Sequence, residues 1–363
     1  MKYASEFRDP QLAKGLLAAI AREVADYPGR MTLMEVCGTH TMSIYQHGIR
    51  SLLPPQIRLI SGPGCPVCVT PIGYVDRAVA YARQTDVIIA TFGDMVRVPG
   101  STSSLLHEQA VGAQIKIVYS ALDAVALAEK NPEKKVIFLG VGFETTAPTI
   151  AGSIVEAKRR GLKNYFVLSA HKTMPTPMAA LASDPELQVD GYICPAHVSA
   201  VIGAEAYQPL VDSFKVPCVV TGFEPLDMLR GIQLLAQQVA QGRAEVENEY
   251  QRIVKPQGNK KAQALIAEVF EACDTAWRGI GVIPSSGLQI RADYAAFDAE
   301  VQLPADVEAP KEHAGCLCGE ILKGKITPKQ CPLFRKACTP ENPVGACMVS
   351  SEGTCAAEYK YGG

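Results

Sequence analysis

Short apolar runs rich in β-branched residues alternate with amphipathic segments from about residue 31 to residue 240. This alternation is typical of repeated βα units, in which each strand is followed by a helix. Strands are predicted at residues 31–36, 57–61, 86–92, 115–120, 136–141, 165–170, 191–196 and 216–221. The helices that follow them are expected to begin near Met42, Pro71, Ser103, Leu122, Ala147, Pro175, Ser199 and Pro225.

The order of these units predicts an α/β fold with two similar βα-repeat domains, each built on a mainly parallel sheet. The first four units are assigned to domain I, residues 28–131, and the next four to domain II, residues 132–240. The rhythm ends near Gln241. Residues 241–363 are expected to form a third, Cys-rich region, against which the helical N-terminal segment, residues 1–27, packs.

Composition limits the classes of function. The formal net charge is -2, and no Lys/Arg run is longer than residues 158–160, so no nucleic-acid partner is predicted. The N-terminus has no apolar signal segment and no stretch is long enough to span a bilayer, so a cytoplasmic location without a membrane partner is expected. In that reducing compartment, clustered cysteines among the 12 are interpreted as metal ligands or catalytic thiols rather than disulfides.

The unusual sequences of the chain follow the predicted strands. In parallel sheets, ligands bind beyond the carboxyl ends of the strands, so these loops are expected to converge on one cleft between the two domains. The five loops are CGTHT (37–41), GPGCPVC (62–68), FGDMVRVPGS (92–101), GFETTAP (142–148) and HKTMP (171–175).

Two cysteines, Cys65 and Cys68, lie three positions apart in the second of these loops. Thr70 and Pro71 are typical of a helix start, so Cys68 is expected beside a helix N-terminus, which lowers the pKa of a thiol. The pair therefore favours redox or transient metal chemistry, and the alternative is half of a structural zinc site.

Other candidates come from the remaining loops. Cys37 and His40 form a possible ligand pair, whereas His171 and His197 each follow a predicted strand. Glu144 is a candidate base or hydrogen-bond acceptor. The glycines around it lack the spacing of a dinucleotide fingerprint, and no phosphate-binding lysine follows, which disfavours a nucleotide-dependent enzyme.

Six cysteines gather near the C-terminus among prolines and glycines. Such a loop-rich segment buries little apolar surface, and four thiolates around a metal centre would order it. Zinc sites favour Cys-x2-Cys pairs, and none occurs here, which favours an iron–sulfur cluster. The six are Cys316, Cys318, Cys331, Cys338, Cys347 and Cys355.

The five loops together resemble those of the HypD hydrogenase-maturation family, and the resemblance spans nearly the whole chain. The tail also resembles that family's Cys-x14-Cys-x6-Cys-x16-Cys pattern. The resemblance implies that the third region is an iron–sulfur domain whose [4Fe-4S] ligands are Cys316, Cys331, Cys338 and Cys355, with Cys318 and Cys347 spare unless one of them replaces a neighbour.

The resemblance also implies a function. The chain would be a scaffold for assembly of the Fe(CN)2(CO) unit of [NiFe] hydrogenases, with a HypC-type chaperone sharing the iron and a HypE-type protein delivering cyanide. Cys37 would hold the iron, and Cys65 and Cys68 would exchange electrons with the cluster. The diatomic ligands would be held or polarised by His40, Asp94, Glu144 and His171.

This role is that of a maturation scaffold with redox activity rather than of a stand-alone catalyst. The alternative from a different class is a thiol–disulfide oxidoreductase that uses Cys65 and Cys68 on protein substrates and carries a structural metal in the tail.

Overall fold

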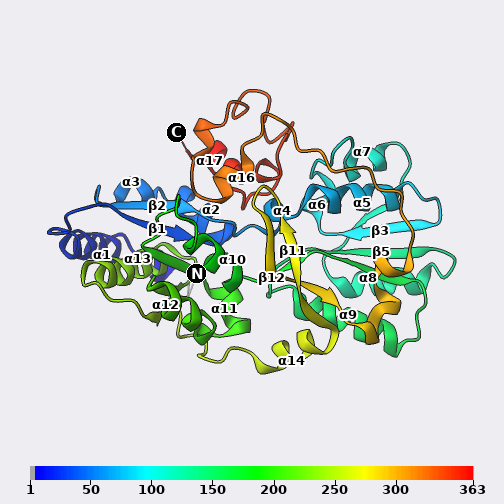
Figure 1. Cartoon of the computed structure of the whole chain (residues 1–363), viewed down its shortest axis with the longest axis horizontal. Helices are drawn as coiled ribbons and strands as arrows, with labels where there is room; N and C mark the ends of the chain where they lie inside the picture. Colours follow the sequence, from blue (N-terminus) through cyan, green and yellow to red (C-terminus); the bar gives the residue numbers. More distant parts are fainter. Residues whose placement is uncertain (1–4, 363) are drawn as a thin grey trace.

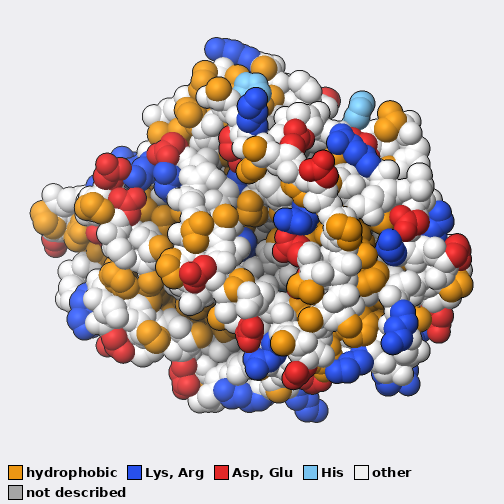
Figure 2. All heavy atoms as spheres, turned by 45° about the vertical axis from the view of Figure 1, so that its right-hand side comes forward, with side chains coloured by type: hydrophobic (Ala, Val, Ile, Leu, Met, Phe, Trp, Pro, Cys, Tyr) orange, Lys and Arg blue, Asp and Glu red, His pale blue; other side chains and the backbone are white. Residues whose placement is uncertain are grey.

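Two α/β lobes lie at opposite ends of the long axis of the molecule, with an antiparallel hairpin between them and the Cys-rich tail above their junction (Figure 1). The computed structural model describes residues 5–362. Residues 1–4 and 363, which belong to the predicted third region, lie outside the described residues. On the face drawn in Figure 2, Lys and Arg side chains are interspersed with Asp and Glu.

Each lobe contains one parallel sheet, and the hairpin belongs to a third, antiparallel sheet. Sheet A has the strand order β10 (Val246–Asn248), β9 (Cys218–Thr221), β8 (Gly191–Pro195), β1 (Met31–Glu35) and β2 (Ile57–Ser61). Sheet B has the order β4 (Ile115–Ile117), β3 (Val87–Thr91), β5 (Lys135–Gly140) and β6 (Tyr165–Ser169). Sheet C has the order β11 (Phe270–Trp277), β12 (Gly281–Ile290) and β7 (His171–Lys172).

Helices connect the strands and cover the sheets. The α-helices are α1 (Pro10–Glu23), α2 (Gly38–Gln46), α3 (Ile49–Leu52), α4 (Pro66–Val69), α5 (Ile72–Ala82), α6 (Gly93–Val96), α7 (Leu105–Ala110), α8 (Ala121–Lys130), α9 (Ala147–Arg159), α10 (Pro175–Ala182), α11 (Ala196–Ile202), α12 (Gln208–Phe214), α13 (Pro225–Ala240), α14 (Lys260–Val269), α15 (Ala299–Gln302), α16 (Cys318–Leu322) and α17 (Thr354–Tyr361). Within residues 5–362, none of these helices has both the length and the apolar character that crossing a bilayer requires.

The eight predicted strands are all present, with ends that differ by at most three residues from the prediction. Strands β1, β3 and β8 are buried along their whole length, as expected for parallel strands covered on both faces. Local sequence also accounts for several helix starts. Asp9 caps α1 by accepting the amides of Gln11 and Leu12, and Ser120 and Asp123 form a capping box for α8.

The predicted division of the strands at residues 131–132 is wrong. The chain leaves sheet A after β2, builds all four strands of sheet B, and returns to sheet A with β8. Strand β1 therefore pairs with β8 as well as with β2. The prediction assumed that consecutive strands share a sheet, which is a tendency and not a requirement of the polypeptide chain.

The expected third region is also corrected. Strand β10 belongs to sheet A, and residues 270–290, which belong to this expected region, form the β11–β12 hairpin. Helix α1 packs on α13 over sheet A, with Ile20 and Val24 buried against Leu235, instead of contacting the tail. The Cys-rich tail itself is a small lobe of short turns around α16 and α17.

Candidate functional site

Cys37 lies where β1 meets α2, at the carboxyl end of sheet A. It is the N-terminal cap residue of α2, and its side chain is buried. Its sulfur is 4.0 Å from Nδ1 of His197, which comes from α11 at the end of β8. Because β1 and β8 are neighbours in the sheet, parallel pairing places these two side chains together.

The turn that contains Cys65 and Cys68 packs directly on the Cys37 turn. The Gly38 amide donates to the Gly64 carbonyl over 3.2 Å. A Cβ atom on Gly64 would come within 2.0 Å of the Cys37 nitrogen, so only glycine permits this approach. The two thiol loops are therefore in contact, as the loop prediction requires.

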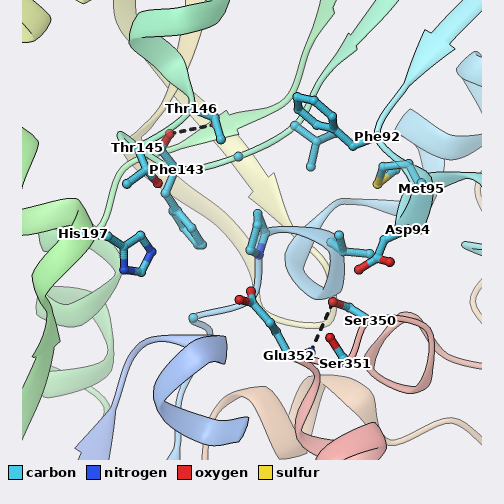
Figure 3. A pocket seen from close by; sticks show the side chains of 16 residues that line it. Phe92, Asp94, Met95, Phe143, Thr145, Thr146, His197, Ser350, Ser351 and Glu352 are labelled. Atoms are coloured by element: carbon cyan, nitrogen blue, oxygen red, sulfur yellow. Dashed lines mark hydrogen bonds between the residues drawn. The ribbon is translucent and has the colours of Figure 1, made fainter. Parts of the chain in front are cut away.

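A cavity of about 490 Å³ opens between the two lobes beside these turns. Figure 3 shows His197 on one side of it, Phe92 and Asp94 on another, and Glu352 reaching up from the tail. The residues that line it are Gly64, Pro66, Val67, Phe92, Gly93, Asp94, Met95, Val141, Gly142, Phe143, Thr145, Thr146, His197, Ser350, Ser351 and Glu352. Cys37 is not among them, and it lies behind His197 and Gly64.

Burial sets the protonation of the groups around Cys37. It raises the pKa of the Cys37 thiol, and the Glu352 carboxylate raises it further. Burial lowers the pKa of His197 to about 4 and that of His40 to about 3, so both rings are neutral near pH 7. The site thus pairs a neutral thiol with a neutral imidazole.

His40 does not contact the cavity. Its Nε2 lies 3.1 Å from the Thr221 carbonyl and 3.0 Å from the Gly222 carbonyl, so this nitrogen carries the proton and donates to both. Its Nδ1 is buried without a hydrogen-bond partner. The ring therefore joins α2 to the end of β9 and leaves one lone pair unused.

Glu35 supports the Cys37 turn from inside the sheet. Its carboxylate accepts the Cys37 amide over 3.2 Å and the Thr41 hydroxyl over 2.6 Å. Burial raises its pKa to about 7, although hydrogen bonds from Ser61 and Thr41 and the nearby Arg50 oppose the shift. This side chain fixes the backbone that presents Cys37.

Cys65 and Cys68 lie at the two ends of one short helical turn. Cys65 caps α4, and its sulfur accepts the Cys68 amide over 3.3 Å. The expected lowering of the Cys68 pKa is wrong: Cys68 lies inside α4 and is fully buried, and burial raises the pKa of its thiol. Desolvation outweighs any effect of the helix terminus, and the neighbouring thiols of Cys347 and Cys65 raise the pKa further.

The tail brings its thiols to the same turn. The Cys68 thiol contacts that of Cys347, which in turn contacts those of Cys318 and Cys355. The sulfurs of Cys316 and Cys318 are 3.3 Å apart. A continuous set of thiols therefore runs from the loop of Cys65 and Cys68 into the tail.

The residues present fit an iron–sulfur cluster. The donor set is made of soft thiols, and a Cβ on Gly345 would lie 2.5 Å from the sulfur of Cys318 and 2.6 Å from that of Cys316, so glycine is what lets both sulfurs pack against the backbone there. Within residues 5–362, no three His, Cys, Asp or Glu side chains are grouped to hold a single metal ion. A cluster has no such requirement, because each thiolate binds a different iron.

The remaining predicted site residues lie in four different places. Asp94 is exposed and lines the cavity. Glu144 is buried beneath it, where Oε1 accepts the Met174 amide over 2.9 Å and Oε2 has no partner. His171 lies in β7, next to Ser169 and Phe270, and does not line the cavity. Cys331 and Cys338 lie in the tail lobe.

Sequence reasoning passed over Glu352. Its Oε1 accepts the Thr39 hydroxyl over 2.7 Å, so the loop between Cys347 and Cys355 covers the Cys37 turn. It also treated Cys318 and Cys347 as spare, although they lie at the centre of the thiol set. No local signal marks Glu352, because its role arises from a contact between residues that are 313 positions apart.

Comparisons with known proteins identify the family of this chain. The model of a family named HypD, described as "Hydrogenase formation hypA family", matches residues 11–362. The chain is 49% identical over 373 residues to the hydrogenase maturation factor HypD of Rhodobacter capsulatus, covering 100% of this chain and 99% of that protein. It is 48% identical to the HypD of Azotobacter vinelandii, covering 100% and 97%, and 44% identical to that of Escherichia coli, covering 99% and 98%. The chain therefore belongs to the HypD family.

Proposed function

We propose that this chain acts in hydrogenase maturation as the scaffold on which an Fe(CN)2(CO) unit is assembled. The observation that carries the proposal is the position of the Cys37 thiol, which lies 4.0 Å from His197, a residue that lines the cavity between the lobes. A soft thiolate is a suitable donor for iron that carries strong-field diatomic ligands. The iron unit is the cargo of this site.

The chain's own residues prepare the donor. The Cys37 thiol must lose its proton to bind metal, and the neutral His197 imidazole, 4.0 Å away, can receive that proton. Glu35 holds the Cys37 amide, and Gly64 keeps the second thiol loop against it. The carboxylates of Asp94 and Glu352 lie on the cavity wall. We assign to Asp94, Glu144, His40 and His171 an indirect role, in which they hold neighbouring parts of the iron site in place.

We assign the [4Fe-4S] ligands to the tail thiols Cys316, Cys331, Cys338 and Cys355, with Cys318 or Cys347 as a substitute for one of them. A bound cluster supplies one-electron redox chemistry. Cys65 and Cys68 interconvert between dithiol and disulfide by releasing or taking up two electrons and two protons. The contact between Cys68 and Cys347 brings this pair to the edge of the ligand set.

The partners and location follow the same proposal. The cavity between the lobes is the place where a HypC-type chaperone would share the iron and a HypE-type protein would deliver cyanide. The cytoplasm, which is reducing, would keep the thiols available for metal.

Infrared spectroscopy tests the iron site. We expect the anaerobically purified complex with a HypC-type partner to show CN and CO stretches that disappear in Cys37→Ala. Cys218→Ala is the matched control, because Cys218 is equally buried in β9 but lies outside the site. Retained bands in Cys37→Ala, in protein that keeps its brown cluster absorption, would remove Cys37 from the iron site.

Absorption and metal content test the cluster. Cys331→Ser or Cys338→Ser is expected to lose most of the brown chromophore, whereas Cys273→Ser should keep it, because Cys273 lies in β11, outside the tail. A colourless wild-type protein that contains zinc after anaerobic purification would contradict the cluster assignment.

The alternative function, a free-standing thiol–disulfide oxidoreductase, is disfavoured because substrates have poor access to the Cys65 and Cys68 thiols. Cys65 is only 3% exposed and Cys68 is fully buried, so a protein disulfide cannot reach the attacking sulfur without a rearrangement. Turnover of a generic disulfide substrate by the isolated chain would favour the alternative.

A further inference from the structure

A second cavity, of about 580 Å³, lies on the far side of the segment that carries Cys65 and Cys68. Pro66 and Val67 line the first cavity, whereas Pro71, Ile72 and Gly73 line the second. Its other walls come from Lys172 in β7, from the β11–β12 hairpin and from residues 300–312. The proposed function makes no use of this space.

Lys172 is an unusual wall residue because it is a buried cation without a counterion. It is only 1% exposed, and its Nζ donates to the Thr275 hydroxyl over 2.7 Å. None of the described carboxylates forms an ion pair with it. A buried charge is costly unless it is paired, and burial lowers the pKa of this amine to about 8. The cavity therefore contains one positive charge, on Lys172, that no carboxylate neutralises.

Arg278, on the turn of the hairpin, adds a second buried cation to the same cavity. It is 5% exposed and pairs with Glu312 over 3.3 Å, but its Nη1 has no hydrogen-bond partner. Its backbone amide donates to the Val69 carbonyl over 2.9 Å, which joins this wall to α4. Guanidinium donors of this kind suit oxyanions.

The start of α5 completes the polar wall. This helix has no acidic residue in its first turn and no side-chain cap, so no side chain neutralises its positive end, and of its first amides that of Tyr74 donates to the Pro71 carbonyl over 3.1 Å. A Cβ atom placed on Gly73, in this turn, would meet only Pro310, at 3.7 Å. The side chain of Ile72, in the same turn, and those of Ala276 and Trp277 from the hairpin provide apolar surface.

The charges around the cavity limit the ligand to a single negative charge. Arg77 is already paired with Glu300 over 2.8 Å, and Arg278 with Glu312. Glu308, at the exposed rim, accepts a hydrogen bond from Thr102 and adds a negative charge that disfavours a polyanion. Only Lys172 lacks a partner carboxylate.

We infer that this second cavity binds a carboxylate, with Lys172 and Arg278 holding the charged group and the Trp277 wall contacting an apolar body. The volume suits a small organic acid or the carboxyl end of a peptide. Since Pro66 and Val67 line the first cavity and Pro71, Ile72 and Gly73 line the second, one short segment of chain connects the two sites. The site requires no iron, so its failure would leave the proposed scaffold intact.

Calorimetry on the intact protein tests this inference with benzoate, its neutral analogue benzamide, inorganic phosphate and N-acetyl-trialanine. We expect saturable binding of a carboxylate, no binding of benzamide, and about tenfold or greater weakening in Lys172→Met. Lys116→Met is the control, because Lys116 is exposed on β4. Tighter binding of N-acetyl-trialanine than of benzoate would indicate that the ligand is the carboxyl end of a peptide rather than a small organic acid.

A measurement on the wild-type protein tests the same inference without depending on the folding of a variant. Benzoate, but not benzamide, is expected to slow reductive methylation of Lys172 by about tenfold or more while Lys116 reacts unchanged. Three results would overturn the inference: no binding by any carboxylate, equal labelling of Lys172 with and without benzoate, or phosphate binding more tightly than benzoate.

Discussion

Buried polar side chains at the carboxyl ends of the strands act mainly by holding the backbone. Glu35 accepts the Cys37 amide, and His40 donates to two carbonyls after β9. Glu144 accepts the Met174 amide with one oxygen, while the other oxygen has no partner. Each stabilises a loop but carries a desolvation cost that depends on its protonation.

Glu144 should therefore make stability depend on pH. Its pKa is raised from 4.5 to about 7, mainly by burial, so the folded protein binds this proton more tightly than the unfolded chain does. The contribution is complete below pH 4.5 and is lost as the pH rises to about 7. Relative to wild type, Glu144→Gln should gain about 3 kcal/mol in the free energy of unfolding across that range.

Urea denaturation at several pH values measures this difference. Glu133→Gln is the control, because Glu133 is exposed and should follow the wild-type curve. A constant difference between Glu144→Gln and wild type at all pH values would show that the carboxyl titrates equally in both states.

At the scale of elements, the site depends on how closely two strand-to-helix turns approach. Cys37 caps α2, Cys65 caps α4, and Gly64 packs against the backbone of Val36 and Cys37. Neighbouring parallel strands bring these turns to one edge of the sheet. A side chain at Gly64 would push the turns apart.

Gly64→Ala should destabilise the protein strongly. The added Cβ would lie 2.0 Å from the Cys37 nitrogen and 2.3 Å from the Val36 carbonyl carbon, both of them backbone atoms that cannot rotate away. We expect a loss of about 3 kcal/mol or more in the free energy of unfolding, measured by urea denaturation.

Gly15→Ala provides the opposite outcome as a control. Gly15 lies in α1, and the position that a Cβ would take there has open space for 4 Å around it, so alanine should stabilise the helix by about 0.5–1 kcal/mol. Equal stability of Gly64→Ala and wild type would mean that the two turns separate freely.

At the scale of the whole molecule, the tail connects the thiol loops across a long stretch of sequence. The loop between Cys347 and Cys355 presents Glu352 to the Cys37 turn, and Cys347, at the start of this loop, contacts the Cys68 thiol. A movement of the tail would therefore displace both thiol loops. Arg97 adds a further link from the sheet B lobe to the Pro340 carbonyl.

Glu352→Gln should make the Cys37 thiol more acidic. The Glu352 charge raises the pKa of Cys37, whereas glutamine keeps an acceptor for the Thr39 hydroxyl and removes the charge. In metal-free, reduced protein we expect alkylation of Cys37 to accelerate on the order of threefold at constant pH, as followed by mass spectrometry.

Glu341→Gln, a change at an exposed residue of the tail, should leave the Cys37 alkylation rate unchanged. A rate for Glu352→Gln that matches the control would show that the carboxylate does not act on the Cys37 thiol.

The alternation of apolar runs predicted the eight strands and the helices that follow them, because parallel strands buried on both faces have continuous hydrophobic sequences. Motifs at the carboxyl ends also predicted that the Cys37 turn lies against the turn of Cys65 and Cys68. No local sequence pattern indicates which strands pair, which is why the predicted division between the two sheets was wrong.

Local sequence was enough to predict the βα units, the position of the thiol loops after the strands, and the family. Only the tertiary structure decided that β8 returns beside β1, that His197 therefore meets Cys37, and that Glu352 and Cys347 join the tail to the site. The physical reason is that local propensity and periodicity depend on neighbours within a few residues. Burial, charge pairing and thiol contacts depend instead on segments brought together from distant parts of the chain.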